Sequence, residues 1–325
     1  MPLEPAPELV TRFAARLDRL IPPPASLGLA VSGGGDSVAL LLLAAAARPG
    51  KIEAATVDHS LRPQSEAEAT GVADLCKRLG VPHATLKVRW EEQPETAIQE
   101  RARAERYRLL GNWVTERGLA ALATAHHLDD QAETLLMRLA RGAGVRGLGA
   151  IRPLGPMPGS SHRLVRPLLG WSRNELRQIC EAAGVEPVDD PSNDNEQFER
   201  VRVRRELARA DWLDPRAVAR SAFNLAAADA ALDWAAAREW ERSVDRQTQQ
   251  IAYRPAGTPL EIRRRIVERA VGLVATESIG TPLRGREIDR LLELLAAGGT
   301  ATLRGARCSG GEVWTFSPAP PRRPG

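Results

Sequence analysis

A glycine-rich loop between an apolar strand and an apolar helix carries the clearest chemical signal in the sequence. It follows the run Leu27–Val31, precedes Val38–Ala47, and consists of Ser32, Gly33, Gly34, Gly35, Asp36 and Ser37. Glycines let a backbone bring its N–H groups close to an anion, and a helix N-terminus adds partial positive charge. The loop therefore predicts a phosphate cradle. It is not a Walker A loop, and a cradle without lysine favours attack at an α-phosphate with pyrophosphate leaving.

Paired acidic and basic side chains follow in the same half of the chain. Asp130 and Glu133 stand three apart on a predicted helix and share one face. Such a carboxylate pair can hold Mg²⁺ or an ammonium group, although an ordinary acidic first turn that stabilises the helix dipole is the alternative. Arg103 and Arg106 are also three apart and can neutralise charge on an α-phosphate. The alternative for them is an exposed helix face of ion pairs.

Two further segments supply candidate ligand-binding residues. Asp58 and His59 follow the predicted strand Ile52–Val57, where they either border an adenosine or cap the strand end. An arginine series follows an Asx/Pro turn. On an extended segment it presents one charged edge to an RNA backbone or to ATP phosphates, and on a helix it forms a solvated basic face. Its members are Arg200, Arg202, Arg204, Arg205 and Arg209.

An alternating fold would bring these residues together. Strands are expected at 27–31, 52–57, 82–88 and 119–124, and helices at 37–47, 65–79, 94–117 and 128–140. This alternation predicts an α/β fold with a doubly wound, mostly parallel sheet, which binds ligands at the carboxyl ends of its strands. Residues 151–166 are predicted to be a loop, and 171–184 a further helix.

The remainder of the chain predicts a smaller and mainly helical domain. Helices are expected at 217–242, 260–275 and 286–297. A hairpin of 301–308 and 312–317 around a Ser-Gly-Gly turn should follow, with a frayed tail. We therefore expect two domains, 1–212 and 213–325.

Composition limits the class of protein. The chain has 325 residues, enough for about two domains, and a net charge of only +4. All but three of its basic residues are arginine, which suits an RNA partner as well as an arginine-rich genome. The longest apolar run, Val38–Ala47, is too short to cross a bilayer. Three widely separated cysteines, Cys76, Cys180 and Cys308, exclude a disulfide scaffold. These features favour a cytoplasmic protein without a membrane partner.

The loop SGGxDS after the first strand resembles the signature of the PP-loop, or N-type, ATP pyrophosphatases, which implies an adenine-nucleotide-hydrolase-like fold. Further segments occur in order: VDHSLR at 57–62, AHHLDDQAET at 125–134, RGAGVRGL at 141–148, RPLL at 166–169, DPSND at 190–194 and RVRVR at 200–204. Together they resemble the tRNA(Ile)-lysidine synthetases over about residues 25–210. The chain departs from that pattern at Val201, where the family has asparagine.

The resemblance implies a reaction and its partners. The C2 oxygen of the wobble cytidine, in an isoleucine tRNA with a CAU anticodon, attacks the α-phosphate of ATP. The ε-amine of free L-lysine then displaces AMP and leaves lysidine. ATP and Mg²⁺ are the implied cofactors, the second domain is expected to help hold tRNA, and a homodimer is compatible with the sequence.

We expect specific residues to serve this reaction. ATP should contact the glycine loop together with Asp58 and His59, and Asp36 should bind the metal ion. Lysine should bind Asp130 and Glu133, one of which accepts its proton. The expected catalytic residues are Asp36, Arg106, Asp130, Glu133 and Arg200. The residues expected to contact tRNA or phosphate are Arg103, Arg202, Arg204 and Arg205.

Thiolation of tRNA by a related PP-loop enzyme is the alternative function. Such thiolases need a persulfide cysteine or a cysteine-held iron–sulfur cluster, and Cys76 and Cys180 are spaced loosely like a thiolase pair. Both stand at apolar helical positions, however, where a thiol is usually a core atom. The sequence therefore favours lysidine formation over thiolation.

Overall fold

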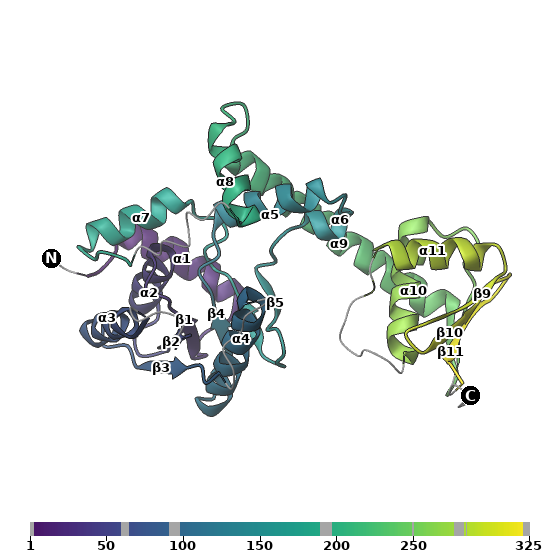
Figure 1. Ribbon diagram of the computed structural model, residues 1–325, viewed down its shortest axis with the longest axis horizontal. Helices are drawn as coiled ribbons and strands as arrows, with labels where there is room; N and C mark the ends of the chain where they lie inside the picture. Colours follow the sequence, from purple (N-terminus) through teal and green to yellow (C-terminus); the bar gives the residue numbers. More distant parts are fainter. Residues whose placement is uncertain are drawn as a thin grey trace. The chain divides into compact units, whose positions relative to one another are not determined.

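The computed structural model describes residues 3–59, 65–90, 98–188, 197–248, 250–275, 283 and 285–320. The chain divides into two compact units, Met1–Ala226 and Ala227–Gly325 (Figure 1). The division lies inside helix α9 (Pro215–Ser243) rather than at the expected position 212. The reason is that Val218 and Ala222, near the start of α9, pack with the core of the first unit.

The first unit contains a six-stranded sheet in the order β3-β2-β1-β4-β6-β5. All neighbouring pairs are parallel except β5 with β6. The four predicted strands are confirmed as β1 (Leu27–Ala30), β2 (Ile52–Asp58), β3 (His83–Lys87) and β4 (Ala121–Ala123). The predicted loop at 151–166 is partly wrong, because it contains β5 (Leu154–Pro156) and β6 (Arg163–Val165). Three-residue strands are too short to show a periodic pattern.

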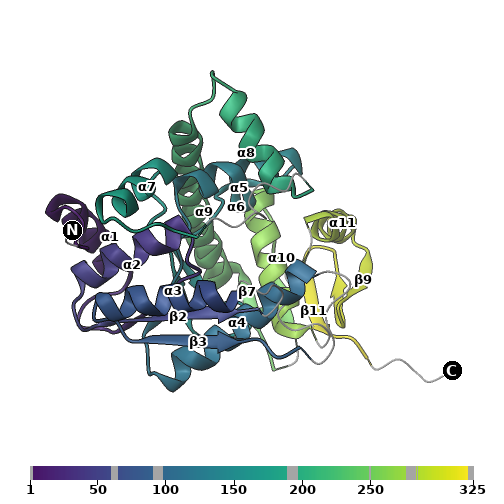
Figure 2. The same ribbon diagram turned by 60° about the vertical axis from the view of Figure 1, so that its left-hand side comes forward.

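Helices cover both faces of this sheet (Figure 2). The predicted helices are confirmed as α2 (Gly35–Ala47), α3 (Ser65–Arg78), α4 (Ile98–Glu116) and α5 (Leu128–Ala140). One core lies under α2, α3, α7 (Arg173–Ala182) and α1 (Pro7–Leu20). Of these four helices, only α1 was not predicted from the sequence. The other core joins α4 to the opposite face through Tyr107, Trp113 and Leu164. Because the connections change direction between β1 and β4, the ligand edge predicted for such sheets lies at the ends of these two strands.

Three turns return the chain to the amino edge of the sheet, directly before β2, β3 and β4. Each contains one glycine in the left-handed region, Gly50 (φ 70°), Gly80 (φ 66°) and Gly118 (φ 63°). A β-carbon at any of them would meet nothing within 4 Å. The predicted site residues lie elsewhere, at the carboxyl ends of the strands and on the helices that follow.

The arginine series forms a helix, α8 (Glu199–Arg209), so the expectation of an extended segment is wrong. The helix is stabilised because Val201 and Leu207 are buried, and Leu207 packs in one core with Leu135 of α5. On a helix, Arg200 and Arg204 share one face. A short helix, α6 (Val145–Leu148), lies between α5 and β5.

The second unit contains a five-stranded antiparallel sheet in the order β7-β8-β11-β10-β9. Helices α10 (Leu260–Val274) and α11 (Gly285–Ala296) confirm two predicted helices. The strands are β7 (Val244–Arg246), β8 (Ile251–Tyr253), β9 (Thr300–Leu303), β10 (Ala306–Ser309) and β11 (Trp314–Pro318). The sheet is thus larger than the single hairpin that the sequence predicted, since the expected strand 301–308 is itself a hairpin.

Arg304 and Gly305 form the turn of this unexpected hairpin. Both have positive φ, 51° and 76°, and Leu303 pairs with Ala306 across the turn. Two left-handed residues in a two-residue loop are typical of a type I′ turn. The turn could not be predicted from the sequence, because Asn or Asp usually occupies its first position and this chain has Arg304 there.

A buried arginine joins α9 to α10 inside the second unit. Arg265 contacts Asp229 at 2.7 Å, Asp233 at 2.5 Å and Glu261 at 2.8 Å, and only 3% of its side chain is exposed. Burial alone would lower the pKa of Arg265, but the three carboxylates raise it. The guanidinium therefore stays charged within the core of this unit.

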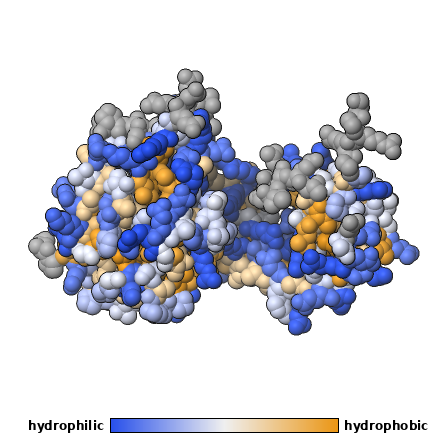
Figure 3. Space-filling view, turned by 90° about the horizontal axis from the view of Figure 1, so that it is seen from below, coloured by the Kyte–Doolittle hydropathy of each residue, from blue (hydrophilic) through white to orange (hydrophobic). Residues whose placement is uncertain are grey.

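Polar side chains cover most of the visible surface of each unit, with smaller apolar patches between them (Figure 3). Across the described ranges, none of the helices is both long enough and apolar enough to span a membrane.

Candidate active site

The glycine loop joins β1 to α2 and is held in shape by its own serine. Ser37 Oγ donates to the carbonyl of Gly34 at 2.8 Å and accepts the backbone N–H of Ser32 at 3.1 Å. The hydroxyl of Ser37 thus fixes the loop. Gly33 has a φ of +90°, and a β-carbon there would lie 3.3 Å from Val188. A side chain at position 33 would therefore be strained and crowded.

The N-terminus of α2 faces the carboxyl edge without a side-chain cap. Its N-cap is Gly34, and no side chain accepts from the first turn. The first N–H groups of a helix have no intrahelical partner, so those of Gly35 and Asp36 are available to an anion. This arrangement, in which a strand, a glycine loop and an uncapped helix follow one another, is suited to binding phosphate.

Asp36 lies beside His127 from the end of β4. Asp36 Oδ2 is 3.3 Å from His127 Nε2, and the other carboxylates near this ring belong to Asp129 (3.4 Å, to Nδ1) and Asp130 (3.6 Å, to Nε2). Burial alone would lower the pKa of His127, but the three carboxylates raise it to about 10. The backbone N–H of Asp129 points at Nδ1 from 3.2 Å, which favours a neutral ring. Three nearby carboxylates outweigh this one weak hydrogen bond, so we assign His127 as a cation.

Asp130 belongs to the cap of α5 as well as to the site. Its Oδ2 accepts the backbone N–H of His127 at 3.0 Å, and its Oδ1 lies 3.3 Å from Arg200 Nη1. The carboxylate is only 14% exposed. Burial would raise the pKa of Asp130, but His127 and Arg200 lower it. The alternative of a solvated acidic first turn is therefore wrong in one respect, because Asp130 caps the helix from a buried position.

Glu133 is the most buried carboxylate at this edge, with 1% of its side chain exposed. Arg204 Nε donates to its Oε1 at 2.8 Å, whereas its Oε2 has no hydrogen-bond partner in the described structure. Arg200 Nε lies 3.8 Å from Oε2, and Arg173 Nη2 lies 4.0 Å from Oε1. Burial would lower the pKa of Arg204, but Glu133 raises it. One carboxylate oxygen thus remains unsatisfied inside a cationic environment.

A second group of residues gathers around His126. Burial, together with Arg166, Arg106 and Arg200, lowers the pKa of His126 to about 4, although Asp130 opposes the shift. Its Nδ1 contacts Thr124 Oγ1 at 2.9 Å. Arg106 also lowers the pKa of His59, after burial, which makes the larger contribution. Both imidazoles are therefore neutral at pH 7, next to Arg106.

The structure brings together most of the predicted site residues and separates two of them. Asp36, Asp130, Glu133, Arg200 and Arg204 form one connected set of charges. The exceptions are Arg202 and Arg205, which are exposed on α8, where Arg202 Nη1 donates to the carbonyl of Gln197 at 3.2 Å.

Sequence reasoning missed three contributors to this site. Arg173 donates its backbone N–H to Asp129 at 2.8 Å, and Thr134 Oγ1 lies 3.3 Å from Arg200 Nη2. The AHHLDDQAET segment contains Asp129 and Thr134, so their proximity could have been anticipated there. Arg173 has no such signal, because only the fold brings α7 to this edge.

Asp36 is a suitable ligand for a metal ion that substrate phosphates share. Among the described residues, no group of three or more His, Cys, Asp or Glu side chains could hold a metal. Mg²⁺ needs only one or two carboxylates when substrate phosphates supply the other oxygens. Asp36 is 38% exposed and adjoins the glycine loop. Its carboxylate fits such a shared ion.

All three cysteines are buried core residues. Burial raises the pKa of Cys76 to about 12 and those of Cys180 and Cys308 to about 11. Cys180 Sγ donates to the carbonyl of Gly35 at 3.4 Å, directly below the glycine loop. Such protonated thiols are unsuited to forming a persulfide or holding a cluster.

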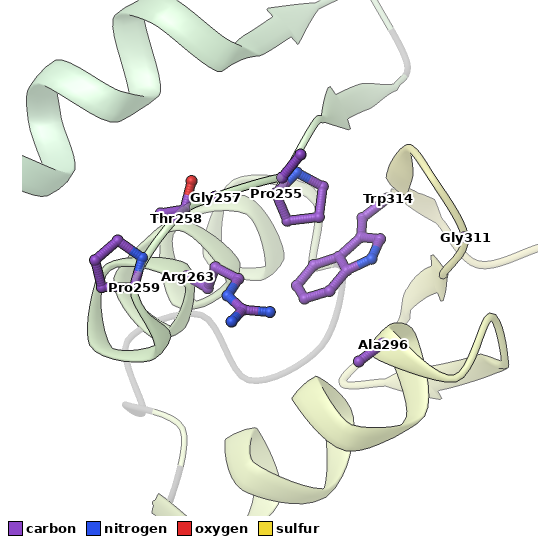
Figure 4. A pocket seen from close by; sticks show the side chains of 9 residues that line it. Pro255, Gly257, Thr258, Pro259, Arg263, Ala296, Gly311 and Trp314 are labelled. Carbon is purple, nitrogen blue, oxygen red and sulfur yellow. The ribbon is translucent and has the colours of Figure 1, made fainter.

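A cavity of about 500 Å³ lies in the second unit and contains none of the predicted site residues. Arg263 and Trp314 face each other across it, and the segment Pro255–Pro259 forms one wall (Figure 4). The cavity carries no titratable pair or glycine loop. The charged edge of the first unit is therefore the candidate active site.

The fold and the loop define a nucleotide-binding protein of the PP-loop class. The ATP_bind_3 family model, described as a PP-loop domain, matches residues 9–211. The U34-tRNA thiolase NcsA from Methanococcus maripaludis superposes with a TM-score of 0.54 at 14% identity, over 66% of this chain and 77% of that one. At that identity the likeness shows a shared fold.

Relatives of higher sequence identity show which family of PP-loop proteins the chain belongs to. The tRNA(Ile)-lysidine synthase of Zymomonas mobilis is 42% identical over 91% of this chain and 89% of its own length. The tRNA(Ile)-lysidine synthase of Novosphingobium aromaticivorans is 44% identical over 96% of this chain and 94% of its own length. The chain therefore belongs to the tRNA(Ile)-lysidine synthase family, and the fold and family predicted from the sequence are confirmed.

Proposed function

We propose that the protein ligates lysine to C2 of the wobble cytidine of a CAU-anticodon isoleucine tRNA. The cytidine O2 attacks the α-phosphate of ATP, and pyrophosphate leaves. The lysine ε-amine then attacks C2, the C2–O bond breaks with release of AMP, and the amine loses its proton. The observation that carries this proposal is the buried Glu133 with its unpartnered Oε2, close to Asp130 at the edge that also carries the glycine loop.

The glycine loop is proposed to bind the ATP phosphates. The N–H groups of Gly35 and Asp36 suit an anion, and His59 and Asp58 stand at the end of β2, where a nucleoside can lie. Mg²⁺ held by Asp36 would neutralise phosphate charge during attack. Arg106 and Arg200 are proposed to stabilise the charge that develops at the α-phosphate.

Glu133 and Asp130 are proposed to bind lysine. Glu133 Oε2 offers an acceptor to the ε-ammonium, and a charge-assisted hydrogen bond there would satisfy a buried oxygen. A protonated amine is not a nucleophile, so one of these carboxylates must take its proton before attack. When lysine is absent, Arg200 and Arg204 offset the repulsion between the carboxylates of Asp130 and Glu133.

The RNA is proposed to contact the exposed arginines of α8 and the second unit. Arg202 and Arg205 are exposed and suit phosphate contacts. Because tRNA is the substrate, we place the protein in the cytoplasm. A homodimer is a separate proposal that the mass of the protein in solution tests.

Incubation with tRNA, ATP and labelled lysine, followed by nucleoside analysis, tests the function. We expect label in one modified cytidine, and none when the wobble cytidine is replaced by uridine. Glu133→Gln should abolish labelling. Glu53→Gln is the matched control, because Glu53 forms a partly exposed ion pair with Arg117 and lies towards the amino end of β2. Label in no nucleoside, or sulfur incorporation instead, would contradict the proposal.

A further inference from the structure

Arg166 is a partly buried arginine with one guanidinium nitrogen that donates a hydrogen bond and another that has no partner in the described structure. It directly follows β6, and its Nη1 donates to the carbonyl of Arg152 at 2.8 Å. Its Nε is buried and has no acceptor among the residues that the structure describes. Buried donors are rarely left unpaired, and elsewhere in this protein buried arginines such as Arg265 contact carboxylates. The Nε of Arg166 is therefore available to an acceptor that the chain does not supply.

The position of Arg166 places this donor at the ligand-binding edge. Strands β4 and β6 are parallel neighbours, and Thr124 N–H donates to the carbonyl of Val165 at 3.0 Å. His126 and Arg166 thus follow the ends of adjacent strands. The glycine loop follows β1, two strands away, which corresponds to about 10 Å across the sheet.

A second unpaired arginine, Arg103, lies nearby on α4. Its guanidinium is exposed and lies 5.1 Å from the ring centre of Tyr107. Tyr107 shares one core with Leu164 of β6, so this turn of α4 is adjacent to the strand that precedes Arg166. Burial lowers the pKa of Arg166, and Arg103 lowers it further. In the described part of the chain, neither arginine forms an ion pair with a carboxylate.

We propose that Arg103 and Arg166 form a phosphate subsite for a backbone phosphodiester of the RNA substrate, next to the nucleotide that is modified. Arginine forks bind phosphate oxygens through paired N–H groups. An anion here would satisfy the buried Nε and balance two neighbouring cations. This inference rests on the proposed function for the identity of the RNA, although the subsite itself is defined by phosphate chemistry.

RNA rather than ATP is favoured as the source of this phosphate. The glycine loop leads into α2, which packs on one face of the sheet, whereas Arg103 belongs to α4 on the other face. Phosphates held by the loop would therefore lie about 10 Å from Arg166. Arg103 is exposed and Arg166 is partly buried, so a chain arriving from solvent meets one and then the other.

The test measures tRNA affinity across a salt series for Arg166→Met, without ATP or lysine. We expect affinity to fall about tenfold and the log–log salt slope to decrease by about one. Arg166→Lys keeps the charge but loses the fork, so it should keep the slope and bind more weakly than the wild type. Arg163→Met is the matched control, because Arg163 is exposed on β6, the strand that Arg166 follows, and it should bind within about twofold of the wild type.

A second measurement separates the two sources of phosphate. The KM for ATP should be unchanged in Arg166→Met. A raised KM with unchanged tRNA affinity would assign the subsite to ATP and overturn the proposal, as would unchanged affinity and slope. If Arg166→Met also melts at lower temperature, the contrast between the two variants decides. A slope that falls in Arg166→Met and is kept in Arg166→Lys supports a phosphate contact, whereas a slope that falls equally in both indicates a structural role and overturns the proposal. If the wild type binds tRNA through Arg166 but forms no lysidine, the proposed function fails and the subsite stands.

Discussion

Glu133 and Arg204 form a pair whose two members should respond very differently to substitution. Glu133 is 1% exposed and Arg204 is 30% exposed, and their atoms lie 2.8 Å apart. Removing the arginine leaves a carboxylate inside the protein, whereas removing the carboxylate charge leaves an arginine that water can reach. We therefore expect Arg204→Met to be clearly more destabilising than Glu133→Gln.

The contacts set the magnitude of this difference. Breaking a buried ion pair from one side costs about 3–5 kcal/mol. Arg204 is partly exposed and Arg200 still lies 3.8 Å from Glu133, so we expect about 2–3 kcal/mol for Arg204→Met. For a unit of this size, that lowers Tm by about 5–10 °C. Glu133→Gln should cost about 1 kcal/mol, since its amide oxygen can still accept from Arg204.

A double-mutant cycle by thermal and denaturant unfolding checks this reasoning. The variant with both substitutions should be more stable than Arg204→Met alone, because it no longer contains a stranded buried charge. Arg117→Met, which breaks the more exposed Glu53–Arg117 pair, is the control and should cost less than about 1 kcal/mol. Equal losses for Glu133→Gln and Arg204→Met would refute the argument from burial.

Three further results are expected. Asp36→Asn should abolish tRNA-dependent release of pyrophosphate and leave tRNA affinity within about twofold; wild-type release would contradict its assignment to Mg²⁺. Cys76→Ser and Cys180→Ser should keep turnover and lose about 1–3 kcal/mol each, and loss of turnover in a cooperatively melting variant would revive thiolation. Because the fold raises the pKa of both thiols to about 12 and about 11, their contribution to stability should be complete below about pH 8.5 and decline above it. Cys→Ala variants should show less of that decline. Arg200→Ala should slow single-turnover adenylation more than it weakens tRNA binding; unchanged adenylation with a smaller salt slope would make Arg200 an RNA contact.

Elements and site residues could be predicted from the sequence where the residue pattern was long or chemically unusual. Helix 128–140 was predicted with the bounds that α5 has, and strands β1 to β4 follow from short runs between helices. The glycine loop could be placed because strand, glycines and helix are consecutive in the chain. Asp130 and Glu133 could be paired because three-residue spacing on a helix fixes a common face.

The remaining features depend on tertiary contacts that a single sequence does not reveal. Strand β6 has three residues and is stabilised by pairing with β4, where Leu164 lies opposite Leu122. These two residues are 42 positions apart in the sequence. The arginine series alternates as a strand would, yet burial of Val201 and Leu207 makes it helical. The neutral state of His126 results first from its burial and then from Arg166, Arg106 and Arg200, which lie far apart in the sequence.

The open glycine turns at the amino edge have a practical consequence. Gly50, Gly80 and Gly118 have empty space around them, and all the proposed chemistry lies at the opposite ends of the same strands. Insertions in surface turns add little entropic cost, so fluorophores or affinity tags placed there should leave ligation intact. Changes in the length of these turns should not reach the reacting atoms, because the strands of the sheet lie between them.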